Sequence, residues 1–248
     1  MAETTLIFHL SDLHFGNEDK QALDWVAREI ALRKPDAVAV TGDLTMRARA
    51  REFAAAREWF SSLEAPVMVE PGNHDLPGYH LPARYLRPMA RFEAFRSLVE
   101  QRVVFPGLAV VPLNTNVPMQ TRFNWSKGRI SRKSLRSCLD AIDALPAGTQ
   151  ALVAAHHPLR EAGTSGTAYT RGGTQALAEL AKRPVAGVLS GHVHDPFDIM
   201  EPTAHGPVRM IGAGTLSERL RSTPASYNEL RWDGRSLSVT PHQWRVPE

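Results

Sequence analysis

Apolar and polar positions alternate in blocks along the first three quarters of the chain. Nearly continuous apolar runs predict buried strands at 5–10, 36–40, 66–70, 108–114, 150–155 and 185–190. Between these runs, apolar residues recur every three or four positions, which predicts helices near 19–33, 49–63, 131–144 and 173–182. Residues 81–100 also have helical spacing, and we expect Pro88 to bend or split that helix. The alternation is typical of a largely parallel sheet with helices on both faces.

The pattern changes after His194, where strands follow one another without helices between them. Four segments predict these strands, at 197–201, 208–213, 227–232 and 235–240. Asp233 and Gly234, between the last two, predict a tight hairpin. No linker-like composition divides the chain, so we expect an α/β fold in a single domain covering residues 1–248.

Polar residues of unusual chemistry follow five of the predicted strands. The segments are "SDLH" (11–14), "TGD" (41–43), "GNHD" (72–75), "HHP" (156–158) and "GHVH" (191–194). Each segment alone is explained by a turn, a capped helix or a structural histidine. All five, however, lie at the carboxyl ends of predicted strands, and ligand sites in open α/β sheets are built at these ends.

The residue types in these segments indicate a metal site. Aspartate, asparagine and histidine together suit Mn, Fe, Zn or Co better than Ca or Mg, and the set is large enough for two ions. Two such ions need a bridging anion from the protein, and Asp43 beside Gly42 is the natural candidate. Glycines at 42, 72 and 191 allow the backbone to pass close to a crowded site. Asp12 and His14 are separated by one residue, which on an extended strand end points both side chains the same way.

The segments "SDLH", "TGDL", "GNHD", "HHP" and "GHVH", in this order, resemble the signature of the calcineurin-like metallophosphoesterases. The chain is most similar to the branch of bacterial class III cyclic-nucleotide phosphodiesterases and glycerophosphodiesterases, over residues 5–215. The resemblance implies a four-layer αββα sandwich, in which two mixed β-sheets are flanked by helices. It also implies two divalent or trivalent metal ions, of which Mn, Fe or Zn are expected, at the strand ends.

The resemblance also implies which residues hold each ion. The first ion is expected on Asp12, His14, Asp43 and His194. The second is expected on Asp43, Asn73, His156 and His192. His156 is chosen over His157 because it directly follows its strand, and His157 is expected behind the ligands.

Two catalytic residues, His74 and Asp75, follow from the same resemblance. His74 is expected to be free of metal and to donate to a phosphoryl oxygen or protonate the leaving alkoxide. Asp75 is expected to orient the imidazole and favour its charged form. The implied mechanism is in-line attack on phosphorus by a metal-bound hydroxide, without a covalent intermediate.

The expected substrate is a small phosphodiester, such as a cyclic nucleotide or a glycerophosphodiester. The same site can serve phosphomonoesters, and the sequence leaves that alternative open. A nuclease is disfavoured, because no separate DNA-binding segment is evident and aromatic residues are not interleaved with basic ones. A non-enzymatic scaffold is disfavoured because every ligand position is filled. Related enzymes often form dimers, so a homo-oligomer is a further alternative for this chain.

Composition constrains the setting of this chemistry. A formal net charge of +3 and a pI near 9.2 are compatible with anionic substrates. No apolar run approaches the roughly 18–20 residues of a membrane span, and the start lacks a basic leader, so we expect a cytoplasmic location without membrane contact. The single Cys138 excludes an internal disulfide and a cysteine-based zinc site, and we expect it to be a buried helical thiol.

Four other parts of the sequence give weaker indications about the site. His9 is expected to be a core histidine or to lie behind the ligands, and the basic residues of 47–51 are expected to form a solvated face. Residues 77–96 either line the substrate pocket or pack as helix. The glycine-rich segment 212–219 is expected to approach the metals.

Overall fold

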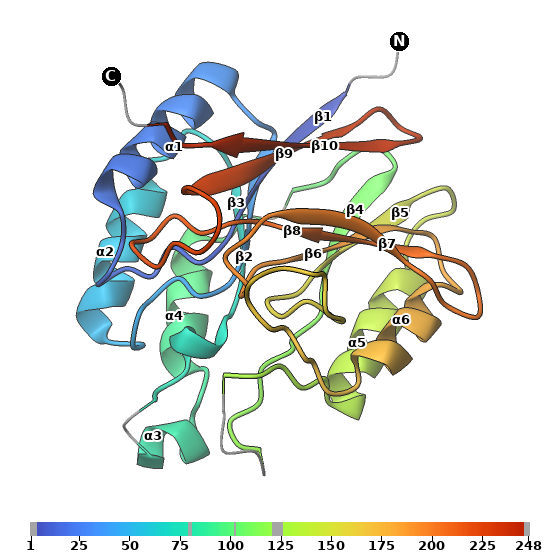
Figure 1. The fold of residues 1–248 in the computed structure, drawn as a ribbon, viewed down its shortest axis with the longest axis horizontal. Coiled ribbons are helices and arrows are strands. Elements are labelled where there is room, and N and C mark those ends of the chain that lie inside the picture. The colour runs from blue at the N-terminus through green and yellow to red at the C-terminus, as the bar shows by residue number, and fades with distance from the viewer. Residues whose placement is uncertain (1–3, 79–80, 102, 121–125, 246–248) are drawn as a thin grey trace.

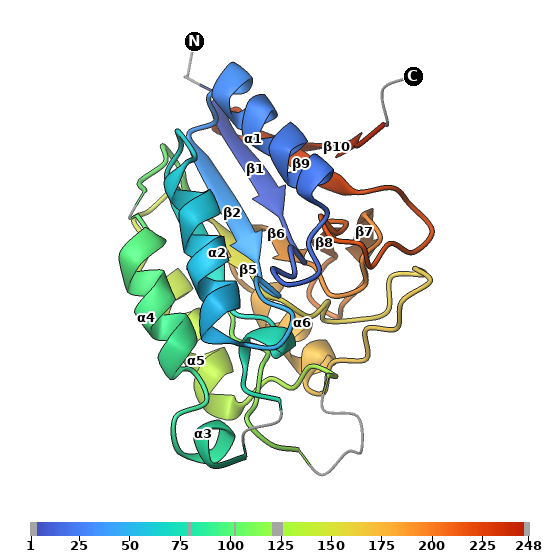
Figure 2. The same cartoon turned by 90° about the vertical axis from the view of Figure 1, so that its left-hand side faces the viewer.

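A computed structural model describes residues 4–78, 81–101, 103–120 and 126–245 of the chain (Figure 1). One five-stranded sheet has the order β10-β9-β1-β2-β3. Its strands are β1 (Thr5–Leu10), β2 (Ala37–Thr41), β3 (Val67–Glu70), β9 (Ser226–Trp232) and β10 (Leu237–Gln243). Strands β1, β2 and β3 are parallel, whereas β9 runs antiparallel to both β1 and β10. Figure 2 shows β1 and β2 running the same way beside α1 and α2.

The second sheet has the order β4-β5-β6-β8-β7. Its strands are β4 (Leu108–Pro112), β5 (Gln150–Ala154), β6 (Val185–Ser190), β7 (Phe197–Glu201) and β8 (Val208–Gly212). Only β7 is antiparallel to its neighbour. Both sheets are therefore mixed, and the antiparallel pairs of each involve strands from the last quarter of the chain, although β8 from that quarter also pairs parallel with β6.

Helices cover the outer face of each sheet. They are α1 (Lys20–Arg33), α2 (Ala50–Ser61), α4 (Ala90–Val99), α5 (Arg132–Asp143) and α6 (Gly173–Leu180), whereas the short α3 (Leu81–Leu86) lies beyond the end of α4 (Figure 1). Figure 1 shows α1, α2 and α4 on one side of the molecule and α5 and α6 on the other. The carboxylate of Asp19 caps α1 by accepting the N–H groups of Gln21 and Ala22. Pro88 lies between α3 and α4, so the predicted split of this helix is confirmed.

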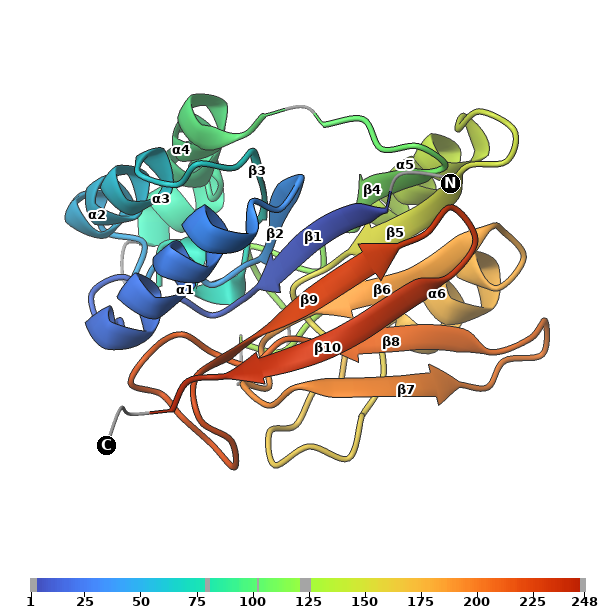
Figure 3. The same cartoon turned by 90° about the horizontal axis from the view of Figure 1, so that it is seen from above.

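Three layers of apolar side chains hold the four layers of secondary structure together. One core lies between the first sheet and helices α1, α2 and α4, and it contains Phe8, Val26 and Phe60. A second lies between the other sheet and helices α5 and α6. The third lies between the two sheets, where Ile7 and Trp232 meet residues such as Leu152, and Figure 3 shows the sheets face to face. The expected four-layer αββα sandwich is confirmed.

The predicted elements match the observed ones closely, because continuous apolar runs mark strands that are covered on both faces. Strands β1, β6 and β7 have the predicted bounds, and the others differ by one to three residues at an end. The hairpin at Asp233 and Gly234 is confirmed, although four residues rather than two join β9 to β10. The carboxylate of Asp233 closes this turn by accepting the N–H groups of Arg235 and Ser236.

Buried positions also agree with the sequence analysis. Cys138 is buried on α5. His9 is fully buried on β1, where Nε2 lies 2.9 Å from the hydroxyl of Thr41 and Nδ1 faces the amide of Asn228. Among the described residues no helix is both long and apolar enough to cross a bilayer. A single domain over residues 1–248 stays a prediction.

One consequence of the fold is testable at Glu70, at the end of β3. Burial, helped by the charges of Glu100 and Glu93 and opposed by Arg96, raises the pKa of Glu70 from 4.5 to about 8. The folded protein therefore binds this proton more tightly than the unfolded chain does. Its contribution to stability is complete below pH 4.5 and is lost as the pH rises through about 8.

We therefore expect Glu70→Gln to weaken the pH dependence of the free energy of unfolding. The Glu70 contribution to this slope is at most about 1.4 kcal/mol per pH unit, and the variant lacks it. Urea denaturation between pH 5 and pH 9 measures the effect, with the exposed Glu58→Gln on α2 as a matched control. Parallel curves for the wild type and Glu70→Gln would show that Glu70 titrates normally.

Candidate metal centre

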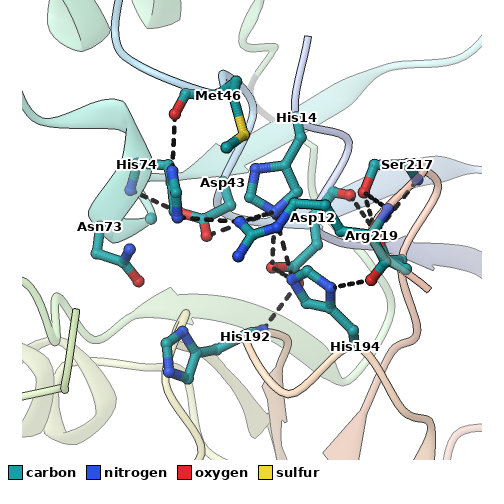
Figure 4. A network of polar contacts seen from close by, with 12 residues as sticks. Asp12, His14, Asp43, Met46, Asn73, His74, His192, His194, Ser217 and Arg219 are labelled. Atoms are coloured by element: carbon teal, nitrogen blue, oxygen red, sulfur yellow. Dashed lines mark hydrogen bonds and ion pairs between the residues drawn. The ribbon is translucent and has the colours of Figure 1, made fainter. Parts of the chain in front are cut away.

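The fold brings the five polar segments to one edge of the sandwich. The predicted ligand residues lie just beyond the ends of their strands, at Asp12 and His14 after β1, Asp43 after β2, Asn73 after β3, His156 after β5, and His192 and His194 after β6. Backbone hydrogen bonds join these turns to one another, from the N–H of Asp12 to the carbonyl of Gly42 and from the N–H of His14 to the carbonyl of Asp43. Figure 4 shows the side chains of Asp12, His14, Asp43 and His194 pointing toward one another.

The first cluster contains Asp12, His14 and His194, all at most 3% exposed. The Nε2 atoms of His14 and His194 lie 3.3 Å apart. Oδ1 of Asp12 lies 3.0 Å from Nε2 of His194 and 3.6 Å from Nε2 of His14. The remaining ring nitrogen of His194 faces the carbonyl of Arg219 at 2.7 Å, which fixes the orientation of the imidazole.

The second cluster is built around His156. Its Nε2 lies 3.2 Å from Oδ1 of Asn73 and 3.4 Å from Oδ2 of Asp43, while its Nδ1 faces the carbonyl of Thr41. The ring of His192 lies 5.2 Å from that of His156, centroid to centroid. Oδ2 of Asp43 also lies 3.8 Å from Nε2 of His14. A single carboxylate thus faces both clusters, as a bridging ligand does.

The spacing of these atoms fits metal ions. Ligand atoms at about 2.0–2.2 Å from a common ion lie roughly 3–3.5 Å from one another. The Nε2 atoms of His14 and His194, which lie 3.3 Å apart, have this separation. So do Nε2 of His156 and Oδ1 of Asn73, which lie 3.2 Å apart. Oδ1 of Asp12 is buried and forms no well-aligned hydrogen bond, although His194 is near it. An ion between these groups would satisfy each of them.

The electrostatics of the site also favour bound cations. Burial opposes the ionisation of Asp12 and Asp43, but His194 beside Asp12 and His156 beside Asp43 hold both pKa values well below their usual range. Burial by itself lowers the pKa of His156, yet Asp43 raises it to about 9. The site therefore stabilises positive charge where the candidate ligands meet.

The turns that carry the ligands have unusual backbone conformations. Seven non-glycine residues in the described part of the chain have positive φ, and five of them are candidate ligands: Asp12, His14, Asp43, His192 and His194. Asp and His visit this left-handed region more readily than most residues, at a cost of about 1–3 kcal/mol each. The prediction that one-residue spacing on an extended strand aligns Asp12 with His14 is wrong, because left-handed turns beyond the strand direct these side chains.

The predicted role of the glycines is confirmed. A Cβ at Gly72 would lie 2.1 Å from the backbone nitrogen and Oδ1 of Asp43. At Gly191 it would lie 1.7 Å from the hydroxyl oxygen of Ser11, and at Gly42, whose φ is +93°, it would lie 2.6 Å from Nδ1 of His156. Any side chain at these positions would displace a candidate ligand or its neighbour.

His74 lies beside the clusters, on the 3-10 turn η1 (Asn73–Asp75). Its Nδ1 lies 2.7 Å from the carbonyl oxygen of Met46, and its Nε2 lies 3.1 Å from Nη1 of Arg219 (Figure 4). A carbonyl only accepts and a guanidinium only donates, so this arrangement places the imidazole proton on Nδ1. The backbone N–H of His74 donates to Oδ1 of Asp43, which ties the turn to the candidate bridge.

The prediction that Asp75 orients His74 is wrong. The carboxylate of Asp75 accepts the backbone N–H groups of Leu44, Thr45 and Gly72 and the hydroxyl of Thr45, at 2.8–3.1 Å. The carbonyl of Met46 orients the imidazole instead. Asp75 therefore joins the turn after β2 to the turn after β3, and its side chain acts on the position of the site rather than on the imidazole.

His156 and His157 have different hydrogen-bond partners in the structure. Nδ1 of His157 lies 2.8 Å from the hydroxyl of Thr115, and Nε2 lies 2.9 Å from the carbonyl of Ser126. Burial, with the neighbouring His156, lowers the pKa of His157 to about 3. His157 belongs with His156 and His192 to a group that could hold an ion, but both its ring nitrogens face neutral protein groups, whereas Nε2 of His156 faces Asp43 and Asn73.

Two residues of the site were not identified from the sequence. Arg219 lies at the end of the segment 212–219, whose approach to the site is confirmed, and its Nη1 lies 3.4 Å from Nε2 of His14 as well as near His74. The carboxylate of Asp195 accepts hydrogen bonds from the N–H and hydroxyl groups of Ser165 and Ser222, which fixes two loops beside the clusters. In the sequence, Asp195 directly follows "GHVH", and this position could have identified it as a residue of the site.

A cavity of about 260 Å³ lies over the candidate ligands. Its walls contain Asp43, Asn73, His74, His192 and His194 together with Ser126, Lys127, Ser165, Gly166, Thr167, Arg219 and Arg221.

The described residues of 77–96 do not line this cavity. The guanidinium of Arg84 donates to the carbonyls of Pro77 and Pro118, and His80 lies outside the described residues. Arg47, Arg49 and Arg51 are exposed, as predicted.

Comparison with known proteins relates the chain to phosphoesterases. A family model described as calcineurin-like phosphoesterase matches residues 5–196. Glycerophosphodiester phosphodiesterase GpdQ of Enterobacter lignolyticus (strain SCF1) is 35% identical over 95 residues, which are 34% of this chain and 34% of that protein. The 3',5'-cyclic adenosine monophosphate phosphodiesterase CpdA of Pseudomonas aeruginosa is 27% identical over 225 residues, 85% of this chain and 75% of that protein.

Solved structures share the fold at low sequence identity. A dimetal phosphatase from Danio rerio superposes with a TM-score of 0.67 at 12% identity, covering 95% of this chain and 98% of that one. The purple acid phosphatase PPD1 from yellow lupin (Lupinus luteus) superposes with a TM-score of 0.63 at 14% identity, covering 98% of this chain and 52% of that one. The family match extends over all five polar segments. The chain belongs to the calcineurin-like phosphoesterase family and is a metal-dependent phosphoric ester hydrolase.

Proposed function

We propose that this enzyme hydrolyses small phosphodiesters of the cyclic-nucleotide or glycerophosphodiester type at a site for two metal ions. The observation that carries the proposal is the single carboxylate of Asp43 facing two ligand clusters beneath a cavity of about 260 Å³. A cavity of this size suits a small substrate. Both relatives with sequence similarity, GpdQ and CpdA, are named as phosphodiesterases, although the GpdQ match spans only a third of that protein.

The residues proposed to hold the ions divide as the two clusters do. Asp12, His14 and His194 with Asp43 form one set, and Asn73, His156 and His192 with Asp43 form the other. The mixture of carboxylate, amide and imidazole suits Mn, Fe or Zn. When bound, such a pair of ions supplies the charge that activates water and stabilises the transition state of phosphoryl transfer.

His74 and Arg219 are proposed to act directly on the phosphoryl group. Nη1 of Arg219 now donates to Nε2 of His74, and a bound phosphoryl oxygen offers this guanidinium a stronger, charged acceptor. Nε2 of His74 is then released from Arg219 and can carry the proton that the leaving alkoxide requires. The contact of Nδ1 with the carbonyl of Met46 holds the ring in place throughout. Asp75 keeps the underlying turns together.

A phosphomonoesterase is the second candidate function. The cavity contains Lys127, Arg219 and Arg221, and these cations would attract the dianion of a monoester as well as the monoanion of a diester. The relative kcat/KM for a phosphodiester and a phosphomonoester therefore decides between the two functions.

The test compares bis(p-nitrophenyl) phosphate with p-nitrophenyl phosphate. The enzyme is stripped with a chelator and resupplied with Mn²⁺, and release of p-nitrophenol is measured for each ester. We expect chelation to abolish turnover and Mn²⁺ to restore it, with the diester hydrolysed more efficiently. A higher kcat/KM for the monoester would replace the proposal with the phosphomonoesterase, and metal-independent turnover would contradict a metal site.

Replacing His74 tests its proposed role. We expect His74→Ala to lower kcat for the diester by roughly 10²–10⁴-fold, the usual contribution of a proton-transfer group, without reducing the metal content. The matched control is His205→Ala, because His205 is exposed and lies between β7 and β8. This variant should retain wild-type turnover. Unchanged kcat in His74→Ala would exclude the proton-transfer role. Loss of metal would make His74 a ligand instead.

A further inference from the structure

The carboxylate of Asp195 joins two segments that line the cavity over the candidate metal centre. Its Oδ2 accepts the N–H of Ser165 at 3.2 Å and the hydroxyl of the same residue. Its Oδ1 accepts the N–H of Ser222 at 3.1 Å and its hydroxyl at 2.7 Å, and the hydroxyl of Thr223 lies 3.4 Å away. Five donors thus converge on one side chain, in a residue that is only 3% exposed.

This number of donors requires a carboxylate at position 195. Each oxygen of a carboxylate accepts hydrogen bonds, and an ionised carboxyl group has no donor of its own to oppose them. Hydrogen bonds to an ionised acceptor are also roughly twice as strong as those between neutral groups. An asparagine would offer one oxygen, and its NH₂ group would face the donors of the other segment. An amide could therefore hold only one of the two segments.

The first of these segments, residues 161–168, is fixed at further points. The carboxylate of Glu161 accepts the N–H of Ala168, which closes the segment on itself. A Cβ at Gly166 would lie 2.7 Å from the carbonyl oxygen of Val193, so this glycine allows the segment to lie directly against the turn after β6. This wall of the cavity is consequently packed against the turn that carries two of the candidate ligands.

The second segment carries Arg219 and Arg221 between β8 and β9. Both residues line the cavity, and Arg219 is the one proposed to act on the phosphoryl group. The carbonyl of Arg219 faces Nδ1 of His194 at 2.7 Å (Figure 4). The turn after β6 therefore holds the arginine segment at two points, through His194 at Arg219 and through Asp195 at Ser222.

Fixing the walls before substrate arrives acts on affinity more than on the rate of the bound complex. A site whose walls are in the binding-competent position for only a fraction of the time binds with an affinity reduced by that fraction. Substrate that does bind selects the competent position, so the reaction of that complex is unchanged. A residue that acts only on this fraction therefore changes KM and the affinity for anions, and leaves kcat nearly constant.

We infer that Asp195 is a positioning residue for substrate, which holds both wall segments over the metal centre and thereby raises the affinity for the phosphoryl group. The inference rests on the proposed contact of Arg219 with that group, and it applies to a diester and a monoester alike. Asp195 is not among the described residues that line the cavity, so it acts through Ser165 and Ser222 on those that do.

Replacing Asp195 with asparagine tests the inference with two kinds of measurement. In Asp195→Asn loaded with Mn²⁺, the KM for bis(p-nitrophenyl) phosphate and the calorimetric Kd of inorganic phosphate should rise at least about tenfold. The kcat should stay within about threefold of wild type, with unchanged metal content. Hydrogen exchange without substrate should become faster in residues 161–168 and 219–223. Asp198→Asn removes the same charge from an exposed position on β7, and this matched control should change none of these quantities.

Two milder variants keep the inference testable if Asp195→Asn does not fold. Ser165→Ala and Ser222→Ala each remove one hydroxyl donor and keep the backbone N–H. Each should raise KM by roughly two- to tenfold, the size of one hydrogen bond. Each should also speed hydrogen exchange mainly in its own segment. Wild-type KM and exchange in both serine variants would overturn the inference.

A merely structural role of Asp195 gives a different result. Asp195→Asn would then be less stable to urea with KM and the phosphate Kd at wild-type values, and this outcome would overturn the inference. A fall in kcat together with loss of metal would overturn it as well, because Asp195 would then act on His194 rather than on the walls. If the wild type hydrolyses neither p-nitrophenyl ester, the proposed function fails, whereas a tenfold rise in the phosphate Kd of Asp195→Asn would still support the inference.

Discussion

The carboxylate of Asp43 is the group on which the rest of the site depends. Its Oδ2 faces His14 in one cluster and His156 in the other, and its Oδ1 accepts the N–H of His74. The backbone carbonyl of the same residue accepts the N–H of His14. One residue thus sets the separation of the two clusters and the position of the proposed acid. A buried carboxylate in this setting is stable only when positive charge surrounds it.

The surrounding structure supports an arrangement that is locally unfavourable. Asp43 and four other candidate ligands have left-handed backbone conformations, and Gly72 and Gly191 are needed so that neighbouring turns can approach. Asp75 stabilises this arrangement with hydrogen bonds to the turns after β2 and β3. Three apolar layers behind the strands hold the strand ends in register. Local strain of this kind is expected at functional sites, where the fold offsets its cost.

Much of this arrangement could be predicted from the sequence, for a physical reason. Doubly covered strands need continuous apolar runs, and metal ligands need His, Asp and Asn, so both signals are visible in residue types. The partner of His74 was not predictable, because the carbonyl of Met46 is a backbone atom and has no signature in the sequence. Arg219 follows "GHVH" by 25 residues, and only the path of the loop after β8 brings its guanidinium to His74.

The most direct test of this account is the metal content of Asp43→Asn. After chelation, reloading with Mn²⁺ and removal of free ions, elemental analysis should find about two ions per wild-type chain. We expect less than one ion per chain in Asp43→Asn, since a neutral amide cannot serve both clusters as a bridging anion does. Asp24→Asn, at an exposed position on α1, is the control. Retention of two tightly bound ions by Asp43→Asn would show that Asp43 is not the bridge.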